Sequence, residues 1–167
     1  MTKQSVAKIR PYRAKDLDAV VNLSLLAWEP FFTSFKGIVG PDIDKLLHPD
    51  WKKMQTKLVT DACKGRKLKV WVAELEGEVV GFFAMKLDHK EKMGEVYLLA
   101  VHPGYSSRGV GTELNLAALE KMKEAGMKIA KVDTGGDPSH APARRSYEKA
   151  GYVGMPVVHY YKDLTKS

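Results

Sequence analysis

The chain has 167 residues, of which 44% are hydrophobic, 28% charged and 9% aromatic. This length and composition are typical of one globular domain, here residues 1–167, and argue against a disordered chain. The 27 lysines and arginines exceed the 20 aspartates and glutamates, giving a net charge of +7. Such a charge favours anionic partners: nucleic acid, an anionic membrane or a phosphorylated small molecule.

The single cysteine, Cys63, excludes an intrachain disulfide framework and a metal site built from several cysteines. We expect Cys63 to be an unreactive helix residue, because a catalytic thiol needs a partner that lowers its pKa. The first residues lack the apolar stretch of a signal peptide, and no run approaches the roughly 20 apolar residues of a membrane span. The sequence therefore predicts a soluble, cytoplasmic protein.

Hydrophobic periodicity predicts the elements of the N-terminal part in chain order. Residues 8–12 form a short strand whose proline favours a sheet edge. Residues 13–28 follow as a helix, with apolar side chains at helical spacing. Residues 30–41 contain two prolines and two glycines, which predict a loop rich in phenylalanine. A second helix is expected over residues 42–63, with a break near Pro49.

The C-terminal part alternates strands and helices. The expected elements are strands 69–76, 79–87 and 94–101, helix 109–125, strand 128–134, helix 142–150 and strand 157–162. A short Glu-Gly-Glu turn joins the first two of these strands into a hairpin. The third is mostly apolar, which predicts a central position in the sheet. This order predicts a mixed α/β domain.

The most informative stretch runs from Leu98 to Thr112, where a strand leads through a glycine-containing loop into a helix. A helix N-terminus presents unpaired N–H groups and a partial positive charge, which suit a phosphate or pyrophosphate. Gly109 and Gly111 have no Cβ atom, so an anion can approach the backbone closely. Arg108 adds a cation at the same place.

Other interpretations compete for this loop. A Walker A loop is excluded, because Val110 stands where the lysine is required. A dinucleotide-binding fingerprint lacks its third glycine, since Leu114 stands there, and the loop after Val101 is too long for the tight turn that the fingerprint needs. A structural role, in which the glycines serve only the turn geometry, stays open.

The strand, the following His-Pro-x-Tyr and the segment Ser106-x-x-Gly109-x-Gly111-Thr112 resemble the acetyl-CoA loop of the GNAT superfamily of N-acetyltransferases. The family's loop usually reads Gln/Arg-x-x-Gly-x-Gly/Ala, so Ser106 departs from it at the first position. The resemblance implies a single-domain GNAT-like α/β fold, in which a mixed central sheet of about six to seven strands is flanked by helices.

A second segment supports the resemblance. The stretch from His140 through Tyr147 to Gly151 and Tyr152 is similar to the family's Asn-x-x-Ala-x-x-x-Tyr-x-x-x-Gly-Phe. His140 stands where the family usually has asparagine, which puts the role of that asparagine in holding the cofactor in doubt. The resemblance covers almost the whole chain.

The resemblance implies that acetyl-CoA is the cosubstrate. The main chain of Leu99 and Val101 is expected to pair with the pantetheine arm, and the N–H groups of residues 108–112 to hold the pyrophosphate. The expected cofactor-binding residues are Leu99, Val101, Arg108, Gly109, Val110, Gly111, Thr112, His140 and Arg144.

Acetyl transfer to an amine needs a proton acceptor, because a primary alkylammonium has a pKa near ~10.4. Glu95 is the first candidate, since it lies on the strand that leads to the cofactor loop. Strand alternation predicts Glu95 and Tyr97 on one face, opposite Val96 and Leu98. Asp133 is the second candidate. For both carboxylates a purely structural role stays open.

By the same resemblance, Tyr147 occupies the general-acid position, from which a phenol protonates the departing thiolate. An unperturbed phenol has a pKa near ~10, close to that of an alkyl thiol. Without the resemblance, Tyr147 would be interpreted as a core aromatic residue.

The acceptor side is expected at the first two helices and the last strand. The candidate substrate-binding residues are Trp28, Glu29, Phe32, Phe35 and His159. Aromatic rings with interleaved carboxylates suit a small cationic amine, although core packing is an open alternative for the phenylalanines. No histidine pair has metal-ligand spacing, so no metal is expected.

These observations predict transfer of an acetyl group from acetyl-CoA to a primary amine of a small molecule, directly in a ternary complex. An aminoglycoside-like antibiotic, a polyamine or an amino-acid derivative would each fit. The alternatives are a protein or peptide N-terminal acetyltransferase and a noncatalytic acyl-CoA sensor. A nucleic-acid module is disfavoured, since the sequence has neither an aromatic-basic repeat nor a helix-turn-helix pattern. A homodimer is compatible with the family.

Overall fold

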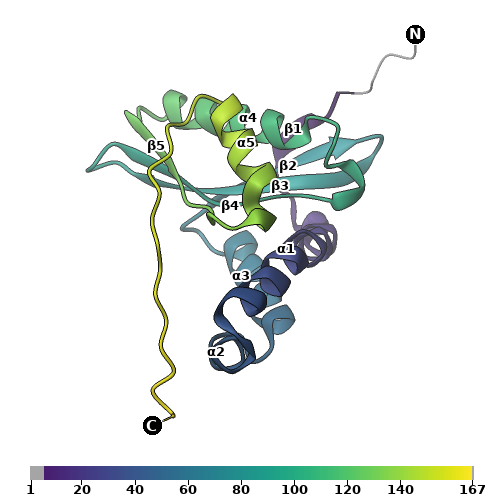
Figure 1. The fold of residues 1–167 in the computed structure, drawn as a ribbon. Helices are drawn as coiled ribbons and strands as arrows, with labels where there is room; N and C mark the ends of the chain where they lie inside the picture. The colour runs from purple at the N-terminus through teal and green to yellow at the C-terminus, as the bar shows by residue number, and fades with distance from the viewer. Residues whose placement is uncertain (1–5, 167) are drawn as a thin grey trace.

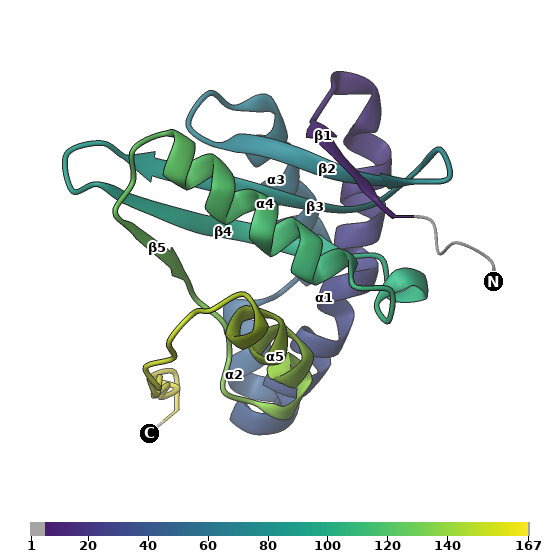
Figure 2. The same ribbon diagram turned by 90° about the horizontal axis from the view of Figure 1, so that it is seen from above.

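The computed structural model describes residues 6–166, which contain a five-stranded sheet with helices on both faces (Figures 1 and 2). Neighbouring strands follow the order β1-β2-β3-β4-β5 and are antiparallel, except for the parallel pair β4 and β5. The strands are β1 (Lys8–Pro11), β2 (Lys69–Leu75), β3 (Glu78–Asp88), β4 (Met93–Val101) and β5 (Ile129–Val132).

The helices are α1 (Leu17–Val39), α2 (Pro41–Leu47), α3 (Trp51–Lys64), α4 (Val110–Glu124) and α5 (Ala141–Lys149). Three short 3-10 turns are η1 (Ala14–Asp16), η2 (Pro103–Tyr105) and η3 (Pro138–His140). Helix α4 covers one face of the sheet, whereas α1 and α3 cover the other; α5 lies beyond the end of β5, beside α4 (Figure 2).

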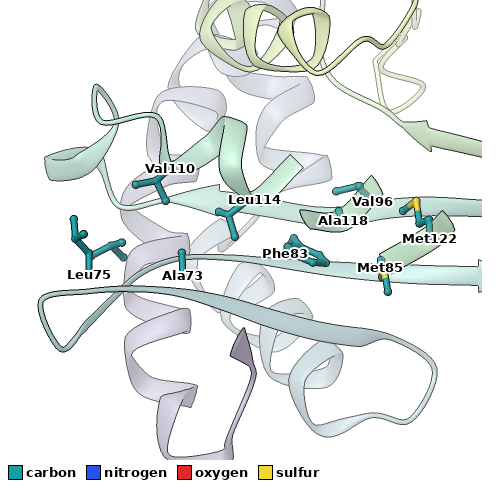
Figure 3. Packing of buried hydrophobic residues seen from close by; sticks show 10 residues of the cluster. Ala73, Leu75, Phe83, Met85, Val96, Val110, Leu114, Ala118 and Met122 are labelled. Atoms are coloured by element: carbon teal, nitrogen blue, oxygen red, sulfur yellow. The ribbon is translucent and has the colours of Figure 1, made fainter. Parts of the chain in front are cut away.

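Two apolar cores hold the layers together, one on each face of the sheet. On the α4 face, Leu114, Ala118 and Met122 recur every fourth residue and pack with Phe83 and Met85 (Figure 3). On the other face, residues of α1 and α3 pack with β2, β3 and β4; they are Val20, Leu23, Val59, Val72, Phe82, Ala84, Leu98 and Ala100. Neighbouring strand residues serve opposite cores, because successive side chains of a strand point to opposite faces.

A buried ion pair fixes the start of α1 against the sheet. The Arg10 guanidinium of β1 donates to both Asp16 carboxylate oxygens, at 2.8 and 3.0 Å, and its Nε donates to Glu74 of β2 at 2.8 Å. Arg10 is 7% exposed and Asp16 4% exposed. The two charges are paired with good geometry, which is the condition for burying them.

Several predicted elements are confirmed. Strand β4 lies between β3 and β5, as its apolar composition predicts, and β1 forms an edge of the sheet. The predicted hairpin is formed by β2 and β3. The predicted break in the second helix separates α2 from α3 at residues 48–50.

The predicted phenylalanine-rich loop is wrong. Helix α1 continues through Pro30 to Val39, so that Phe32 and Phe35 lie on a helix. A proline inside a helix removes one main-chain hydrogen bond. Tertiary packing offsets that loss, because Phe32 stacks on Trp51 of α3 with ring centroids 4.5 Å apart.

The predicted strand over residues 157–162 is also wrong, and with it the count of six to seven strands. The segment is extended but pairs with no strand of the described chain, and Val158 and Tyr160 are 70% and 90% exposed. In Figure 1 it runs away from the sheet towards the C-terminus. A β-prone sequence supplies extended backbone, but a strand also needs a partner edge.

Candidate active site

A cavity of about 640 Å³ opens where β4 and β5 part. Their parallel pairing ends at Val96 and Val132, after which β4 continues to Val101 paired with β3 only. The cavity is lined by this end of β4, by Asp133 and Thr134, and by residues of α1, α4, η3 and α5. A second hollow, on the outer face of α3, contains none of the predicted site residues.

A β-bulge at Tyr97 changes the direction of the side chains that follow it in β4. Ala84 pairs with Leu98 and Met85 with Val96, so Tyr97 has no partner in β3. The predicted alternation is therefore wrong: Val96 packs in the α4 core and Leu98 in the opposite one. A bulged residue changes which face the following side chains occupy.

The free edge of β4 presents the main-chain groups of Leu99 and Val101. The N–H of His102 donates to the Val80 carbonyl at 2.7 Å, so that residue turns its main chain towards β3. Because main-chain groups alternate along a strand, those of Val101 and Leu99 face the opposite edge, where β5 has ended. These are the two residues expected to pair with a pantetheine arm, and both line the cavity.

The N-terminus of α4 forms the floor beside this edge. Gly109 has a left-handed backbone (φ 76°) and, as the N-cap residue, offers no side-chain cap. The Val110 side chain is buried in the α4 core, which leaves only its main chain for a ligand. Gly111 and Thr112 line the cavity. An uncapped N-terminus with these residues suits an anion.

The three arginines near the cavity have different surroundings. Arg108 is exposed and lies over the Tyr105 ring at 5.1 Å, outside the cavity lining. Arg144 donates to the carbonyl oxygens of Gly135 and Asp137, at 2.6 and 2.8 Å, so its guanidinium braces a loop. Arg145, the next residue of α5, lines the cavity.

Tyr147 lines the cavity from α5, with its ring 5.8 Å from that of Tyr152. Burial, with a smaller contribution from Tyr152, raises the pKa of the Tyr147 hydroxyl to about 12. This pKa lies above the value near ~10 of an unperturbed phenol, on which the expected match to an alkyl thiol depends. The hydroxyl stays protonated throughout the physiological pH range and is a hydrogen-bond donor.

The two predicted carboxylates occupy different places. Glu95 pairs in register with Lys86 of β3 and Lys131 of β5, and it does not line the cavity. Asp133 lines the cavity, but its side chain is 74% exposed and forms an ion pair with Lys131 at 3.1 Å.

An aromatic cluster, comprising Phe31, Phe32, Phe35, His48, Trp51, His140 and Tyr161, extends from the cavity along α1. Of these rings, Phe31 and His140 line the cavity, as does the predicted Trp28. Phe32 and Phe35 lie one layer behind, packed on His48. Glu29 is exposed outside the cavity, and His159 is exposed on the C-terminal segment.

A family model for the acetyltransferase (GNAT) family matches residues 26–152, which is most of the chain. The chain belongs to the GNAT family. This confirms the resemblance on which the sequence prediction depended, and with it the expected enzyme class, an acyltransferase of the N-acetyltransferase type.

Among curated GNAT relatives, the mycothiol acetyltransferase of Sanguibacter keddieii is 33% identical over 91 residues, which cover 52% of this chain and 28% of that protein. An uncharacterized N-acetyltransferase of Archaeoglobus fulgidus is 36% identical over 83 residues, covering 47% of this chain and 55% of that protein. This chain therefore spans well under two thirds of these relatives.

Solved GNAT structures share the fold. The PaiA N-acetyltransferase of Thermoplasma acidophilum, in complex with coenzyme A, has a TM-score of 0.67 at 17% identity and covers 91% of this chain and 92% of its own. The aminoglycoside N-acetyltransferase AAC(6')-Iy, in complex with CoA, has a TM-score of 0.61 at 16% identity and covers 98% and 99%. At these identities the likeness shows the fold.

The sequence did not single out Asn115, which lines the cavity, or Asp137, which is hydrogen-bonded to the lining residue His140. Asn115 of α4 is 0% exposed; its Nδ2 donates to Ser146 Oγ at 2.9 Å, while its Oδ1 has no partner in the described chain. Asp137 accepts a hydrogen bond from His140 Nδ1 at 2.5 Å. Neither lies in a recognisable motif, and each acquires its environment from a distant segment.

Outside the cavity, Cys63 lies on α3, and burial raises the pKa of its thiol to about 11, which keeps it in the unreactive protonated form. Within residues 6–166, no three His, Cys, Asp or Glu side chains are grouped so that they could hold a metal ion. None of the described helices combines the length and apolarity that crossing a bilayer requires.

Proposed function

We propose that this chain transfers the acetyl group of acetyl-CoA to a primary amine of a small molecule, by direct attack in a ternary complex. The observation that carries the proposal is one cavity that combines an unpaired strand edge and an uncapped helix N-terminus with an aromatic wall. The first two features suit a phosphorylated, amide-containing arm, and the third suits a cationic amine.

On the cofactor side, Leu99 and Val101 pair with the pantetheine through their main chain, as an added strand would. The N–H groups at Gly109, Gly111 and Thr112 hold the pyrophosphate. Asn115 Oδ1, an open acceptor in the cavity wall, takes an amide N–H of the arm; a buried acceptor without a partner is costly otherwise.

The charged contacts to the phosphates come from Arg108 at the loop and Arg145 at the cavity wall. Arg144 and His140 were both predicted to bind the cofactor, but we assign them no direct contact with the phosphates. Arg144 donates hydrogen bonds to main-chain oxygens of the 135–137 loop, and His140 is hydrogen-bonded to Asp137.

In the chemical step, a main-chain N–H of β4 polarises the thioester carbonyl, a type of stabilisation worth about 3 kcal/mol. Tyr147 donates its hydroxyl proton towards the departing sulfur. Glu95 and Asp133 are the carboxylate candidates for accepting the proton of the ammonium; Asp133 has the more favourable position, since it lines the cavity.

The acceptor is proposed to be an aminoglycoside-like compound, a polyamine or an amino-acid derivative. The fold likeness to aminoglycoside N-acetyltransferases and the sequence likeness to mycothiol acetyltransferases both point towards an amine on a small polar molecule. The cavity of about 640 Å³ is of the size that holds small ligands rather than a protein surface.

We also propose that the chain forms a homodimer. The segment 153–164 exposes seven large apolar or aromatic side chains: Val153, Met155, Val157, Val158, Tyr160, Tyr161 and Leu164. Strand β5 has a neighbour on one edge only. A second copy would cover such surfaces, and light scattering should then report twice the chain mass.

Two experiments test the proposed function. CoA at millimolar concentration should raise the melting temperature, because a ligand that binds only the folded state stabilises it. A panel containing spermidine, sisomicin, glucosamine and a peptide with a free N-terminus should then release CoA thiol from acetyl-CoA with a small amine. Absence of a thermal shift contradicts the cofactor assignment. Binding without turnover favours an acyl-CoA sensor, and turnover of the peptide alone an N-terminal acetyltransferase.

A further inference from the structure

Asp137 is the centre of a hydrogen-bond network that joins α1 to the start of α5. Its carboxylate accepts from Ser34 Oγ of α1 at 2.7 Å, from the Ser139 N–H at 3.2 Å and from the Ser139 hydroxyl. His140 Nδ1 completes the set at 2.5 Å. The Asp137 side chain is only 14% exposed, so these partners replace most of its water.

The partners determine the protonation state of the pair. Burial acts to raise the pKa of Asp137, but the hydrogen bonds from Ser139, Ser34 and His140 together hold it well below its usual range. An ionised carboxylate can only accept hydrogen bonds. His140 Nδ1 therefore carries a hydrogen, and Nε2 of the neutral ring carries the lone pair.

The main chain of the loop before α5 holds Asp137 and His140 in their relative positions. A Cβ atom at Gly135 would lie 2.4 Å from Asp137 Oδ1 and 2.5 Å from His140 Nδ1, so the main chain of Gly135 is packed directly against the pair. Arg144 donates to the main-chain oxygens on both sides of this turn. The imidazole is thus held by its neighbours on three segments.

His140 lies at the start of α5, in the wall of the cavity. It lines the cavity together with Tyr147, which follows two helical turns later and hence roughly 10 Å along the helix axis. Its ring contacts Phe31 edge-on at 5.1 Å, and its side chain is 20% exposed. The hydrogen bonds of the described chain engage Nδ1 and not Nε2, so a ligand in the cavity is the partner that we expect for Nε2.

The two carboxylates expected as bases are less suitably placed. Glu95 does not line the cavity, and Asp133 is exposed and paired with Lys131. We propose that His140, oriented by Asp137, is the general base that deprotonates the acceptor amine. This proposal rests on the proposed acetyltransferase function. His140 is the catalytic residue, and Asp137 is a positioning residue.

The charges around the imidazole are few. The Asp137 carboxylate faces Nδ1. The Arg144 guanidinium of α5 donates a hydrogen bond to the main-chain oxygen of Asp137 and not to its carboxylate. From α1, Phe31 and Ser34 face the pair, and neither titrates near neutral pH. Imidazole is the side chain whose charge ordinarily changes between pH 5 and 8, which suits a base working near neutrality.

The step balances as follows. The ammonium gives one proton to His140 Nε2, and the amine nitrogen forms a C–N bond to the thioester carbon. The C–S bond breaks with its electron pair on sulfur, which takes the proton of Tyr147. Tyr147 regains a proton from the new amide nitrogen, and the imidazolium releases its proton to water. The products are the amide, the CoA thiol and one proton.

The test compares His140→Gln with His48→Gln, using the best acceptor of the amine panel. His48 is a matched control, because its Nδ1 also pairs with an aspartate (Asp44, 3.0 Å) and its ring also packs on phenylalanines, but it does not line the cavity. We expect kcat/KM at pH 7 to fall by roughly 10²–10³-fold in His140→Gln. The wild type and His48→Gln should keep an acid limb between pH 5 and 8, and His140→Gln should lose it.

Asp137→Asn tests the positioning role. We expect a smaller loss of kcat/KM than in His140→Gln and a weaker preference of the ring hydrogen for Nδ1 in the ¹⁵N shifts, because the amide that replaces the carboxylate can donate as well as accept a hydrogen bond. Melting temperatures of all variants separate this effect from unfolding.

An NMR readout is independent of turnover. The ¹⁵N shifts of the wild-type protein, assigned by comparison with His140→Gln, should show the hydrogen of the neutral His140 ring on Nδ1. A hydrogen on Nε2, or an acid limb and rate retained by His140→Gln, overturns the proposal. If the wild type acetylates no amine of the panel, the proposed function itself has failed, and the NMR result still decides the ring's tautomer.

Discussion

The cavity has two parts that are built in different ways. The donor part, lined by residues 97–101 and by Ser106, Ser107, Gly109, Gly111 and Thr112, offers mainly main-chain groups: the free edge of β4 and the first N–H groups of α4. The acceptor part, lined by Trp28, Phe31 and His140 with Asp137 hydrogen-bonded behind His140, offers side chains. The first depends on where a strand loses its partner and a helix begins, whereas the second depends on contacts between segments such as Ser34 and Asp137.

This difference has a practical consequence. A main-chain site tolerates changes of side chain, which fits Ser106 standing at the first position of the GNAT loop. A side-chain site is sensitive to each residue, so the acceptor part is where specificity for the amine is expected to reside. Mutations should separate the two parts kinetically.

The largest effect is expected where the two parts meet. Tyr147→Phe keeps the ring that packs on Tyr152 and removes only the hydroxyl. We expect kcat to fall by roughly 10²–10³-fold while the KM for acetyl-CoA stays nearly constant. Since burial raises the pKa of Tyr147 to about 12, wild-type kcat should show no alkaline limb from this group up to pH 10. Steady-state thiol release measures both, and an unchanged kcat would assign Tyr147 to packing.

A change confined to the donor part is next. A Cβ atom at Gly111 would lie 3.6 Å from Ser146 Oγ and 3.7 Å from Val101 Cγ2, so the longer side chain of Gly111→Leu projects into the cavity. We expect the Kd for CoA to rise by at least roughly ten-fold, or ~1.4 kcal/mol. Calorimetric titration measures it. Gly37→Leu, in open space on α1, is the control; equal CoA affinity of the two variants would contradict the donor assignment.

A third change should affect neither part. Asp16→Asn leaves the buried Arg10 without its main partner, which should lower the free energy of unfolding by about 3 kcal/mol at pH 7 without altering kcat. Hydrogen bonds from Arg10, against the opposing effect of burial, lower the pKa of Asp16 below its ordinary value. Its stabilising contribution is therefore present at pH 7 and is lost as the pH falls below about 4.

Urea denaturation at pH 7 and pH 3 measures this contribution. The gap between wild type and Asp16→Asn should be wide at pH 7 and narrow at pH 3. Asp61→Asn, which breaks the exposed pair with Lys57, should change stability little at either pH. A gap of equal width at both pH values would show that the ion pair does not carry the effect.

The smallest effect is expected at Glu95. Since Glu95 lies outside the cavity, beside Lys86 and Lys131, Glu95→Gln should change kcat by less than roughly two-fold and leave the pH–rate profile in place. Asp133→Asn is the companion variant for the carboxylate at the rim. A collapse of activity in either would move the base from the acceptor part to Glu95, near the start of β4, or to Asp133, directly after β5.

Much of the donor part could be predicted because its signals are local. A helix over residues 109–125, the glycine before it and the apolar central strand all lie within one continuous stretch, and helix formation depends on neighbours three and four residues apart. Leu99 and Val101 were predicted as main-chain contacts through the family resemblance. Because main-chain groups alternate along β4, those of both residues face the edge that β5 leaves free.

The wrong predictions of secondary structure lie where contacts with a distant segment determine the local conformation. Pro30 and two glycines predict a loop, but stacking of Phe32 on Trp51 keeps α1 helical. Residues 157–162 have strand propensity and no partner in the described chain. Alternation from Glu95 fails because Tyr97 forms a bulge, which is a property of the β3–β4 pairing and not of either strand alone.

The sequence by itself determined the family, the glycine-containing loop after β4 and the helix that follows it, because these depend on local motifs and short-range geometry. The tertiary structure alone decided which side chains share the cavity. It replaced Arg144 by Arg145 in the cavity wall and kept Glu95 out of it. It also brought Ser34 and Asp137 together across 103 positions of the chain. A hydrogen bond of this kind forms only after the sheet and both helix layers have packed, so no local pattern records it.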